Sequence, residues 1–170
     1  FKHNNLSELE RLLKKSRQRS PQKKPLVITE SLFSMEGTTA PIKEISKLCI
    51  KYDSKLLIDE AHAFGVMGPE GRGESFGLKE PISIISGTFG KAFGSGGAFL
   101  ATDKTTGENL LQKCGAFRYT TALAPPLCAS ALAALNLIES NPNWGSELKE
   151  NSIALRDRLT QKLSHLMIFL

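Results

Sequence analysis

Two short apolar runs, each followed by polar or glycine-rich residues, constrain this chain more than any other feature. The first run, residues 56–58, ends in the acidic and histidine-containing segment Asp59–His62. The second run, residues 82–86, leads into a glycine-rich turn that carries Lys91. Runs of this length are typical of buried strands, and open α/β sheets bind ligands at the carboxyl ends of their strands. The pattern therefore predicts a site at the carboxyl edge of a sheet.

The residues before the first run predict how its sheet is built. Residues 25–30 form another apolar run, and apolar residues at helical spacing cover residues 41–53, just before the strand expected at 55–59. Strand, helix and strand within about 35 residues form a βαβ unit, which implies parallel pairing of the two strands. A fourth strand is expected at 97–101. A helix is expected to begin near Leu6 and to be ended by Pro21, and further helices are expected at 104–114, 125–139 and 143–163.

The composition excludes several classes of protein. Hydrophobic residues make up 41% and charged residues 23%, as in globular domains. The net charge of +5 is concentrated in Lys14–Lys24, which we interpret as a solvated helix end. Cys49, Cys114 and Cys128 form no CxxC pair, which favours reduced thiols in a cytoplasmic protein. No apolar run approaches the ~18 residues of a membrane span. We expect neither a nucleic-acid nor a membrane partner.

The two ends of the chain indicate a piece of a longer protein. The sequence begins with Phe1 rather than Met, and it stops inside the apolar run Leu166–Leu170. Motifs that are absent here are therefore expected in the missing parts, and residues 1–170 alone are expected to be inactive.

Lys91 is the first candidate for chemistry. It is flanked by apolar residues between two glycines, and burying an ammonium there would destabilise its charged form, which suits a Schiff-base lysine. A solvated surface lysine is the alternative. A phosphate-binding P-loop is excluded, because Ile85 and Ala92 stand where it needs a glycine and a hydroxyl residue. A dinucleotide fingerprint fails at Phe99, where its third glycine would lie.

Asp59–His62 allows two interpretations. Its letters match the Mg-ATP motif of DEAH-box helicases, and Ser86–Thr88 resembles their Ser-Ala-Thr motif. That interpretation gives no role to Lys91 or to Thr120–Thr121. A metal site is weaker still, because the other two histidines have no ligand-like neighbours.

The other interpretation is a site for pyridoxal phosphate. The ring nitrogen of this cofactor must stay protonated if the ring is to accept electrons, and a buried carboxylate at Asp59 would achieve this by charge pairing. Lys91 would hold the cofactor as a Schiff base, and Thr88 would donate a hydrogen bond to its phosphate. His62 is expected within reach of the phenolic oxygen of the ring or of the substrate, unless it is a loop histidine bonded to the backbone.

Five motifs follow one another along the chain: Thr29–Gly37, Asp59–His62, Gly71–Gly73, Gly87–Gly94 and Phe117–Pro125. Together they resemble the α-oxoamine synthases, which are fold type I pyridoxal-phosphate enzymes. The resemblance implies an α/β, aspartate-aminotransferase-like large domain with a mostly parallel sheet flanked by helices, incomplete in this chain. Residues 1–140 would be the second half of this domain, and residues 141–170 a long helix leading to a C-terminal domain.

The resemblance also implies residue roles. Lys91 is the Schiff-base lysine, Asp59 pairs with the pyridine nitrogen, and Thr88 binds phosphate. The phenolic oxygen lies near His62 and Ser34. The substrate cavity is lined by Glu30.

The family condenses an amino acid with an acyl thioester of CoA or of an acyl carrier protein and releases carbon dioxide, with the freed Lys91 removing the α-proton. Tyr119–Pro126 most resembles the member that joins alanine to a pimeloyl thioester in biotin synthesis. Glycine C-acetyltransferase, 5-aminolevulinate synthase and serine palmitoyltransferase share the core motifs.

Thr120 and Thr121 match a segment that reaches the phosphate of the partner subunit in this family. The resemblance therefore implies a homodimer with shared active sites. A helix N-cap is the alternative for these two hydroxyls, because they precede Pro125–Pro126, where a helix is expected to begin.

Overall fold

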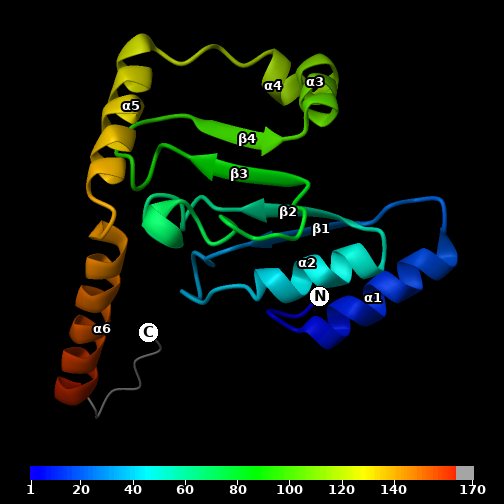
Figure 1. Cartoon of the computed structure of the whole chain (residues 1–170), viewed down its shortest axis with the longest axis horizontal. Helices are drawn as coiled ribbons and strands as arrows, with labels where there is room; N and C mark the ends of the chain where they lie inside the picture. Colours follow the sequence, from blue (N-terminus) through cyan, green and yellow to red (C-terminus); the bar gives the residue numbers. More distant parts are fainter. Residues whose placement is uncertain (164–170) are drawn as a thin grey trace.

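A computed structural model describes residues 1–163. Strands and helices alternate along the first half of the chain, and only helices follow the fourth strand in the described part (Figure 1). The elements are α1 (Leu6–Arg19), β1 (Leu26–Glu30), α2 (Ile42–Lys51), β2 (Lys55–Asp59), the 3-10 helix η1 (Pro69–Gly71), β3 (Ile84–Thr88), β4 (Ala98–Thr102), α3 (Lys104–Lys113), α4 (Gly115–Arg118), α5 (Pro125–Ser140) and α6 (Trp144–Lys162).

The four strands form one sheet in the order β1-β2-β3-β4. The first three strands are parallel, and β4 runs antiparallel to β3, as the arrows in Figure 1 show. The carboxyl ends of β1, β2 and β3 therefore meet at one edge of the sheet. This arrangement confirms the predicted α/β class with a mostly parallel sheet flanked by helices.

The core lies between one face of the sheet and the two helices α1 and α2. Alternation along the strands turns Val27 of β1 and Leu56 and Ile58 of β2 toward these helices, where each is at most 5% exposed. Burial of a side chain of this kind contributes roughly 1.5–3 kcal/mol to stability. The helices supply the rest of the cluster: Leu9, Leu13, Ile42, Ile45 and Cys49.

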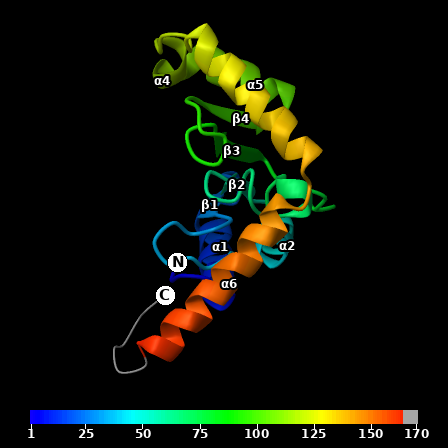
Figure 2. The same cartoon turned by 90° about the vertical axis from the view of Figure 1, so that its left-hand side faces the viewer.

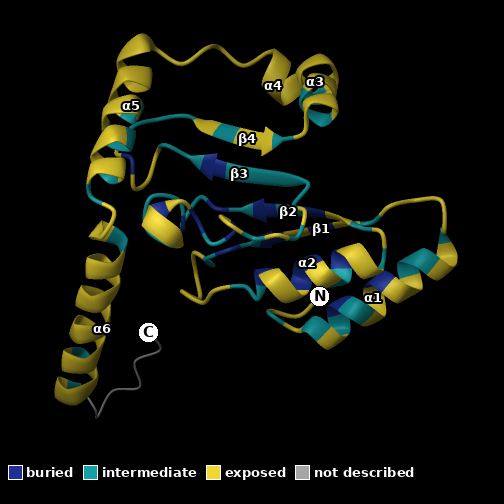
Figure 3. Ribbon diagram, in the orientation of Figure 1, coloured by how far each residue is buried: buried dark blue, intermediate teal, exposed yellow. Residues whose placement is uncertain are grey.

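The opposite face of the sheet is largely uncovered by the described residues. Ile28 of β1 is 61% exposed and Leu100 of β4 is 44% exposed. Figure 3 shows the dark blue of buried residues around β2 and α2, and yellow along most of α5 and α6. The apolar residues of the strands are thus buried on only one face of the sheet, and the polar residues at the strand ends lie on the open face.

Helices α5 and α6 follow each other along the side of the molecule on which β1, β2 and β3 end (Figure 2). Both contact η1, which lies in the loop after β2. None of the described helices is long and apolar enough to cross a membrane. Residues 164–170, the end of the segment predicted as 141–170, lie outside the described residues.

Strand β3 begins two residues later than the apolar run predicts. Ser83 precedes it and bonds to Leu56 twice: its N–H donates to the Leu56 carbonyl at 2.9 Å, and its Oγ accepts from the Leu56 amide at 3.2 Å. At the other end β3 continues to Thr88, because Thr88 pairs with Ala98 of β4. The shift brings Thr88 into the sheet, directly before the lysine turn.

Candidate functional site

Polar side chains form a row across the carboxyl ends of the parallel strands. Glu30 of β1 pairs in register with Asp59 of β2, and Asp59 pairs with Ser86 of β3. Residues in register share a face of the sheet, and the alternation along each strand assigns this row to the face opposite α1 and α2. Three positions far apart in the sequence therefore meet at the open face of the sheet edge.

Asp59 is half-buried at the end of β2, and its Oδ1 accepts a hydrogen bond from the Ala61 amide at 2.8 Å. This bond fixes the carboxylate where the chain leaves the strand. Asp59 and Thr88 line one cavity of about 290 Å³. The other lining residues are Ala61, Ser86, Gly87, Ala98, Phe99, Leu100 and Phe117. The structure thus brings two of the predicted cofactor residues into one site.

Thr88 closes the base of the turn that carries Lys91. Its Oγ1 donates to the Gly97 carbonyl at 3.0 Å and accepts from the Gly90 amide at 3.1 Å. The Phe89 amide donates to the same Gly97 carbonyl at 2.9 Å. The hydroxyl expected to bind phosphate is therefore bonded to the turn itself, at both ends of the segment that presents the lysine.

Lys91 lies at the exposed tip of this turn. The Gly94 amide donates to the Lys91 carbonyl at 2.9 Å, and Gly94 has a φ of +57°, a conformation that glycine adopts without strain. Phe93 is 4% exposed and stacks on Phe64, with ring centroids 4.8 Å apart. The expectation that Lys91 is buried among its apolar neighbours is wrong for the described chain, because the turn buries the phenylalanine and leaves the lysine outside.

Glu30 and Ser34 contact each other. The Glu30 Oε2 accepts a hydrogen bond from the Ser34 amide at 3.1 Å, and Ser34 is exposed in the loop that follows β1. His62 is half-buried in the turn after β2. Glu30 therefore ends β1, and Ser34 and His62 follow β1 and β2, at the same sheet edge as Asp59.

Thr120 and Thr121 do not lie at the start of α5. The N-cap of α5 is Ala124, which makes no side-chain capping bond, and the Thr120 hydroxyl donates to the Ala116 carbonyl of α4. The N-cap alternative for these two residues is wrong. Both are exposed, and the cavity with Asp59 is lined by Phe117 but by neither threonine.

Sequence reasoning missed Glu60. It is 1% exposed, and its carboxylate accepts hydrogen bonds from the Ser31 hydroxyl at 2.6 Å, the Ser75 amide at 2.7 Å and the Glu74 amide at 3.2 Å. The pyridoxal-phosphate interpretation of Asp59–His62 gives roles to the acid and the histidine at the ends of the segment, and none to Glu60. The available signal was an acid directly after a buried strand, followed by the glycine-rich loop of residues 65–73.

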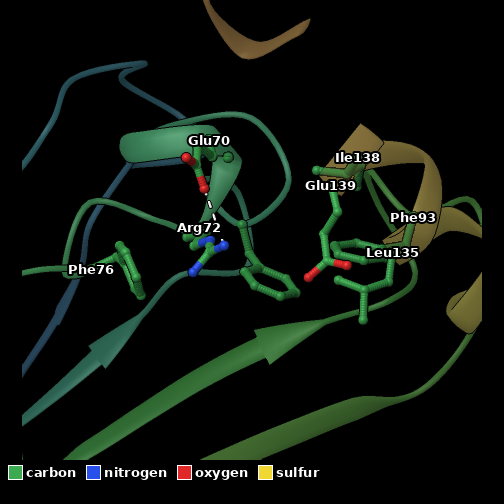
Figure 4. A pocket seen from close by; sticks show the side chains of 9 residues that line it. Glu70, Arg72, Phe76, Phe93, Leu135, Ile138 and Glu139 are labelled. Atoms are coloured by element: carbon green, nitrogen blue, oxygen red, sulfur yellow. Dashed lines mark ion pairs between the residues drawn. The ribbon is translucent and has the colours of Figure 1, made fainter. Parts of the chain in front are cut away.

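A second cavity, of about 360 Å³, was also not predicted. Figure 4 shows Arg72 ion-paired with Glu70, at 3.1 Å, on one side and Glu139 of α5 facing them from the other. Phe76 lies beside Arg72, whose guanidinium is 4.9 Å from the ring centroid. Phe64, Phe93, Leu135 and Ile138 supply apolar walls. This cavity lies between the loop after β2 and α5.

Residues 1–168 match the family model of aminotransferase class I and II. The 8-amino-7-oxononanoate synthase of Anaeromyxobacter dehalogenans is 41% identical over 150 residues, which are 87% of this chain and 37% of that protein. The enzyme of the same name from Methylobacillus flagellatus is 44% identical over 141 residues, 82% of this chain and 35% of that protein. The chain therefore spans little more than a third of the length of these relatives.

Solved structures agree with this match. Serine palmitoyltransferase with its PLP internal aldimine superposes with a TM-score of 0.82 at 31% identity, over 94% of this chain and 40% of that chain. The 8-amino-7-oxononanoate synthase of Francisella tularensis superposes with a TM-score of 0.76 at 30% identity, over 95% of this chain and 46% of that chain. These matches leave no place for the helicase interpretation of Asp59–His62. The chain belongs to the class I and II aminotransferase family, and its fold is that of the fold type I pyridoxal-phosphate enzymes.

Proposed function

We propose that the longer protein to which this chain corresponds is a pyridoxal-phosphate-dependent C-acyltransferase of the α-oxoamine synthase group. One observation carries the proposal: Asp59 and Thr88 line the same cavity, and the turn with Lys91 begins directly after Thr88. An acid, a hydroxyl and a lysine at the carboxyl edge of an α/β sheet are the groups that such a cofactor requires.

The groups present fit pyridoxal phosphate chemically. The Asp59 carboxylate would hold the protonated ring nitrogen, since opposite charges at short range favour the charged form of both groups. Ala61 and Gly87 are small, so they leave room for a flat ring in the cavity that they line. Thr88 would turn its hydroxyl hydrogen from the Gly97 carbonyl to a phosphate oxygen, because the rotation of a hydroxyl is free.

The chain's own residues then have defined tasks. When bound, the cofactor supplies an electron-accepting ring that stabilises negative charge on the α-carbon of an amino acid. Lys91 Nζ would hold the cofactor covalently and, once displaced by the amino acid, would take the α-proton as a general base. His62 and Ser34 would orient the phenolic oxygen, and Glu30 would line the substrate cavity.

We propose L-alanine and a pimeloyl thioester of CoA or of an acyl carrier protein as substrates, with decarboxylation, as a step of biotin synthesis. The support is that relatives named 8-amino-7-oxononanoate synthase are 41% and 44% identical to this chain over 87% and 82% of its length. A different α-oxoamine synthase activity is the second candidate. It is favoured by the higher TM-score of serine palmitoyltransferase, 0.82 against 0.76. Steady-state assays with alanine, glycine and serine and with thioesters of several chain lengths distinguish the two.

The protein is proposed to act as a homodimer in the cytoplasm. Its three cysteines are all free, as expected in a reducing compartment. Thr120 or Thr121 would reach the phosphate of the partner's cofactor, a role that suits their exposed position outside the cavity of their own chain. Residues 1–140 would then be the second half of the cofactor domain, and residues 141–170 would lead to the next domain.

The test is to reduce the full-length protein with borohydride in the presence of pyridoxal phosphate and to map the labelled peptide. The label is expected on Lys91, and Lys91→Ala is expected to remove the label and nearly all turnover while the protein stays folded. A label on another lysine would refute the assignment. ATP hydrolysis that nucleic acid stimulates would refute the whole proposal.

A further inference from the structure

A fully buried carboxylate lies directly beside the proposed cofactor acid and has no task in the chemistry described above. Glu60 is 1% exposed, and three hydrogen bonds of 2.6 to 3.2 Å converge on its two oxygens. Among the described residues, none of the ion pairs involves it. A buried charge without a cation is costly unless hydrogen bonds satisfy it, so its position reflects a specific requirement of the fold.

The three donors come from two different segments. Ser31, which is completely buried, follows β1, and Glu74 and Ser75 end the glycine-rich loop that begins after β2. The main chain of Glu60 adds a third connection, because its amide donates to the Ser86 carbonyl of β3 at 2.8 Å. Glu60 therefore ties the far end of the loop to the carboxyl ends of three strands.

Gly73 shows how closely the loop fits the carboxylate. It has a φ of +91°, and a Cβ built on it would lie 2.9 Å from Glu60 Cδ and 3.0 and 3.1 Å from its oxygens. Any side chain at this position would push the carboxylate away from its donors. The absence of a side chain at Gly73 and the three hydrogen bonds of Glu60 thus belong to one packing arrangement.

The loop held in this way touches both parts of the proposed site. The Ala61 amide, next to Glu60, is the donor that fixes Asp59 Oδ1 at 2.8 Å. Phe64 in the same loop stacks on Phe93, two residues after Lys91, with ring centroids 4.8 Å apart. A loop that moves away from Glu60 would therefore release the Asp59 carboxylate and remove the support under the lysine turn.

We propose that Glu60 is a positioning residue, which clamps loop 61–75 against the sheet edge and thereby sets the place of Asp59 and of the Lys91 turn. The inference rests on the proposed function, since it assigns Asp59 and Lys91 to one cofactor. It differs from a stabilising role because it concerns one loop: the core between α1, α2 and the sheet does not include Glu60.

The test uses the full-length protein with Glu60→Gln, and Glu74→Gln as the matched control. Glu74 enters the clamp only through its backbone amide, so its side chain can change without breaking a bond to Glu60. Hydrogen exchange of the cofactor-free protein and the Kd for pyridoxal phosphate are measured for each.

Glu60→Gln replaces one carboxylate oxygen, which accepts hydrogen bonds, by an NH2 group, which donates them. This NH2 group would face a hydrogen-bond donor in place of an acceptor. We expect about tenfold faster exchange in residues 61–75, unchanged exchange in α2, and about tenfold weaker cofactor binding. The control should match the wild type.

Two further variants keep the test decisive if Glu60→Gln does not fold. Ser31→Ala removes one of the three donors, and the added methyl group of Gly73→Ala pushes on the carboxylate from the loop side. Both variants should speed hydrogen exchange in the loop and weaken cofactor binding, as Glu60→Gln does. Unchanged loop exchange, equal acceleration in α2, or a loosened loop with unchanged cofactor affinity would each overturn the assignment of Glu60. A wild-type protein that does not bind pyridoxal phosphate would overturn the proposed function as well, which separates the two failures.

Discussion

The two halves of the chain are similarly rich in apolar residues but differ in how they use them. From Leu9 to Phe93 the chain builds a core in which ten apolar residues are buried. After Phe93 no described residue is buried, although α5 carries leucines at 127, 132 and 137 that are 39 to 59% exposed (Figure 3). Apolar side chains at helical spacing are therefore not sufficient for burial, because a second surface must cover them. Exposed apolar patches like the one on α5 are typical of surfaces that contact another part of the protein or another subunit.

The first half supplies its own partner surfaces. Helices α1 and α2 cover the sheet face formed by β1 and β2, and these four elements together form one buried apolar cluster. The second half has no such cover within the described residues. Because the chain spans 37% of a relative that is 41% identical to it, we expect the exposed face of α5 to be covered by the longer protein or its partner subunit. Five predictions test this comparison.

The largest effect is expected from one alanine substitution in each half of residues 1–170. Ile45→Ala removes a side chain that is 1% exposed and should lower the free energy of unfolding by about 2–5 kcal/mol. Leu132→Ala, at a site that is 59% exposed, should change it by less than about 0.5 kcal/mol. Urea denaturation measures both. In the full-length protein Leu132→Ala should cost more, and an equal cost in both chains would contradict the idea that this face is covered.

The cysteines should report the same contrast by their reactivity. Cys49 is 2% exposed, and burial raises the pKa of its thiol from 9.0 to about 11, whereas Cys128 on α5 is exposed. At pH 8 a thiol reagent should label Cys128 at least about a hundredfold faster, because only the thiolate reacts and Cys49 is shielded. Urea should remove the difference.

The raised pKa of Cys49 also has a consequence for stability. Since the unfolded thiol ionises near pH 9 and the folded one only near pH 11, this contribution to stability is complete below pH 9 and is lost as the pH rises toward 11. Cys49→Ser should flatten that decline. If the thiol reagent labels Cys49 as fast as Cys128 in the folded chain, the core of the first half does not shield Cys49 from solvent.

Mixing two inactive full-length subunits tests whether the exposed second half serves a partner. If Thr121 acts in the partner's site, a heterodimer of Lys91→Ala and Thr121→Val subunits has one site with both lesions and one intact site. Random mixing should then restore roughly a quarter of the activity, because half of the dimers are mixed. The two variants must each be impaired alone. No recovery would mean that both residues serve the site of their own chain.

The smallest effect is expected at the surface of the first half. Lys24 donates to Asp53 at 2.7 Å, and this hydrogen bond lowers the pKa of the Asp53 carboxyl below its usual 3.8. The pair therefore contributes stability above pH 3.8, and the contribution is lost as the pH falls through the lower, folded pKa. Asp53→Asn keeps a residue that tolerates the φ of +48° at this position.

For Asp53→Asn we expect a decrease of about 1–2 °C in the melting temperature at pH 7, since exposed ion pairs contribute little, and a decrease that shrinks as the pH falls below 3.8. Lys24→Met should behave alike. A decrease as large as that of Ile45→Ala would show that the surface, not the core, distinguishes the first half.

Local patterns were sufficient to predict most of the fold. The strands at 55–59 and near 26–30 and the helices after Pro41 and Pro125 were predicted from spacing and from proline, because periodicity and backbone geometry act over a few residues. The order of Asp59 before Lys91 likewise indicated the sheet-edge site, since βαβ connections bring successive strand ends to one edge.

The tertiary structure alone decided what each of these residues touches. The register of Glu30, Asp59 and Ser86 and the end of β3 at Thr88 depend on pairing between strands far apart in the sequence. The exposure of Lys91 depends on Phe93 stacking on Phe64, a contact across 29 positions. Nothing in the sequence distinguishes Glu60 from a solvent-exposed acidic residue, yet it is buried because Ser31 and the loop around Gly73 cover it. Burial and hydrogen bonding depend on which segments contact each other. The spacing of residues within one segment does not specify which distant segment it will contact.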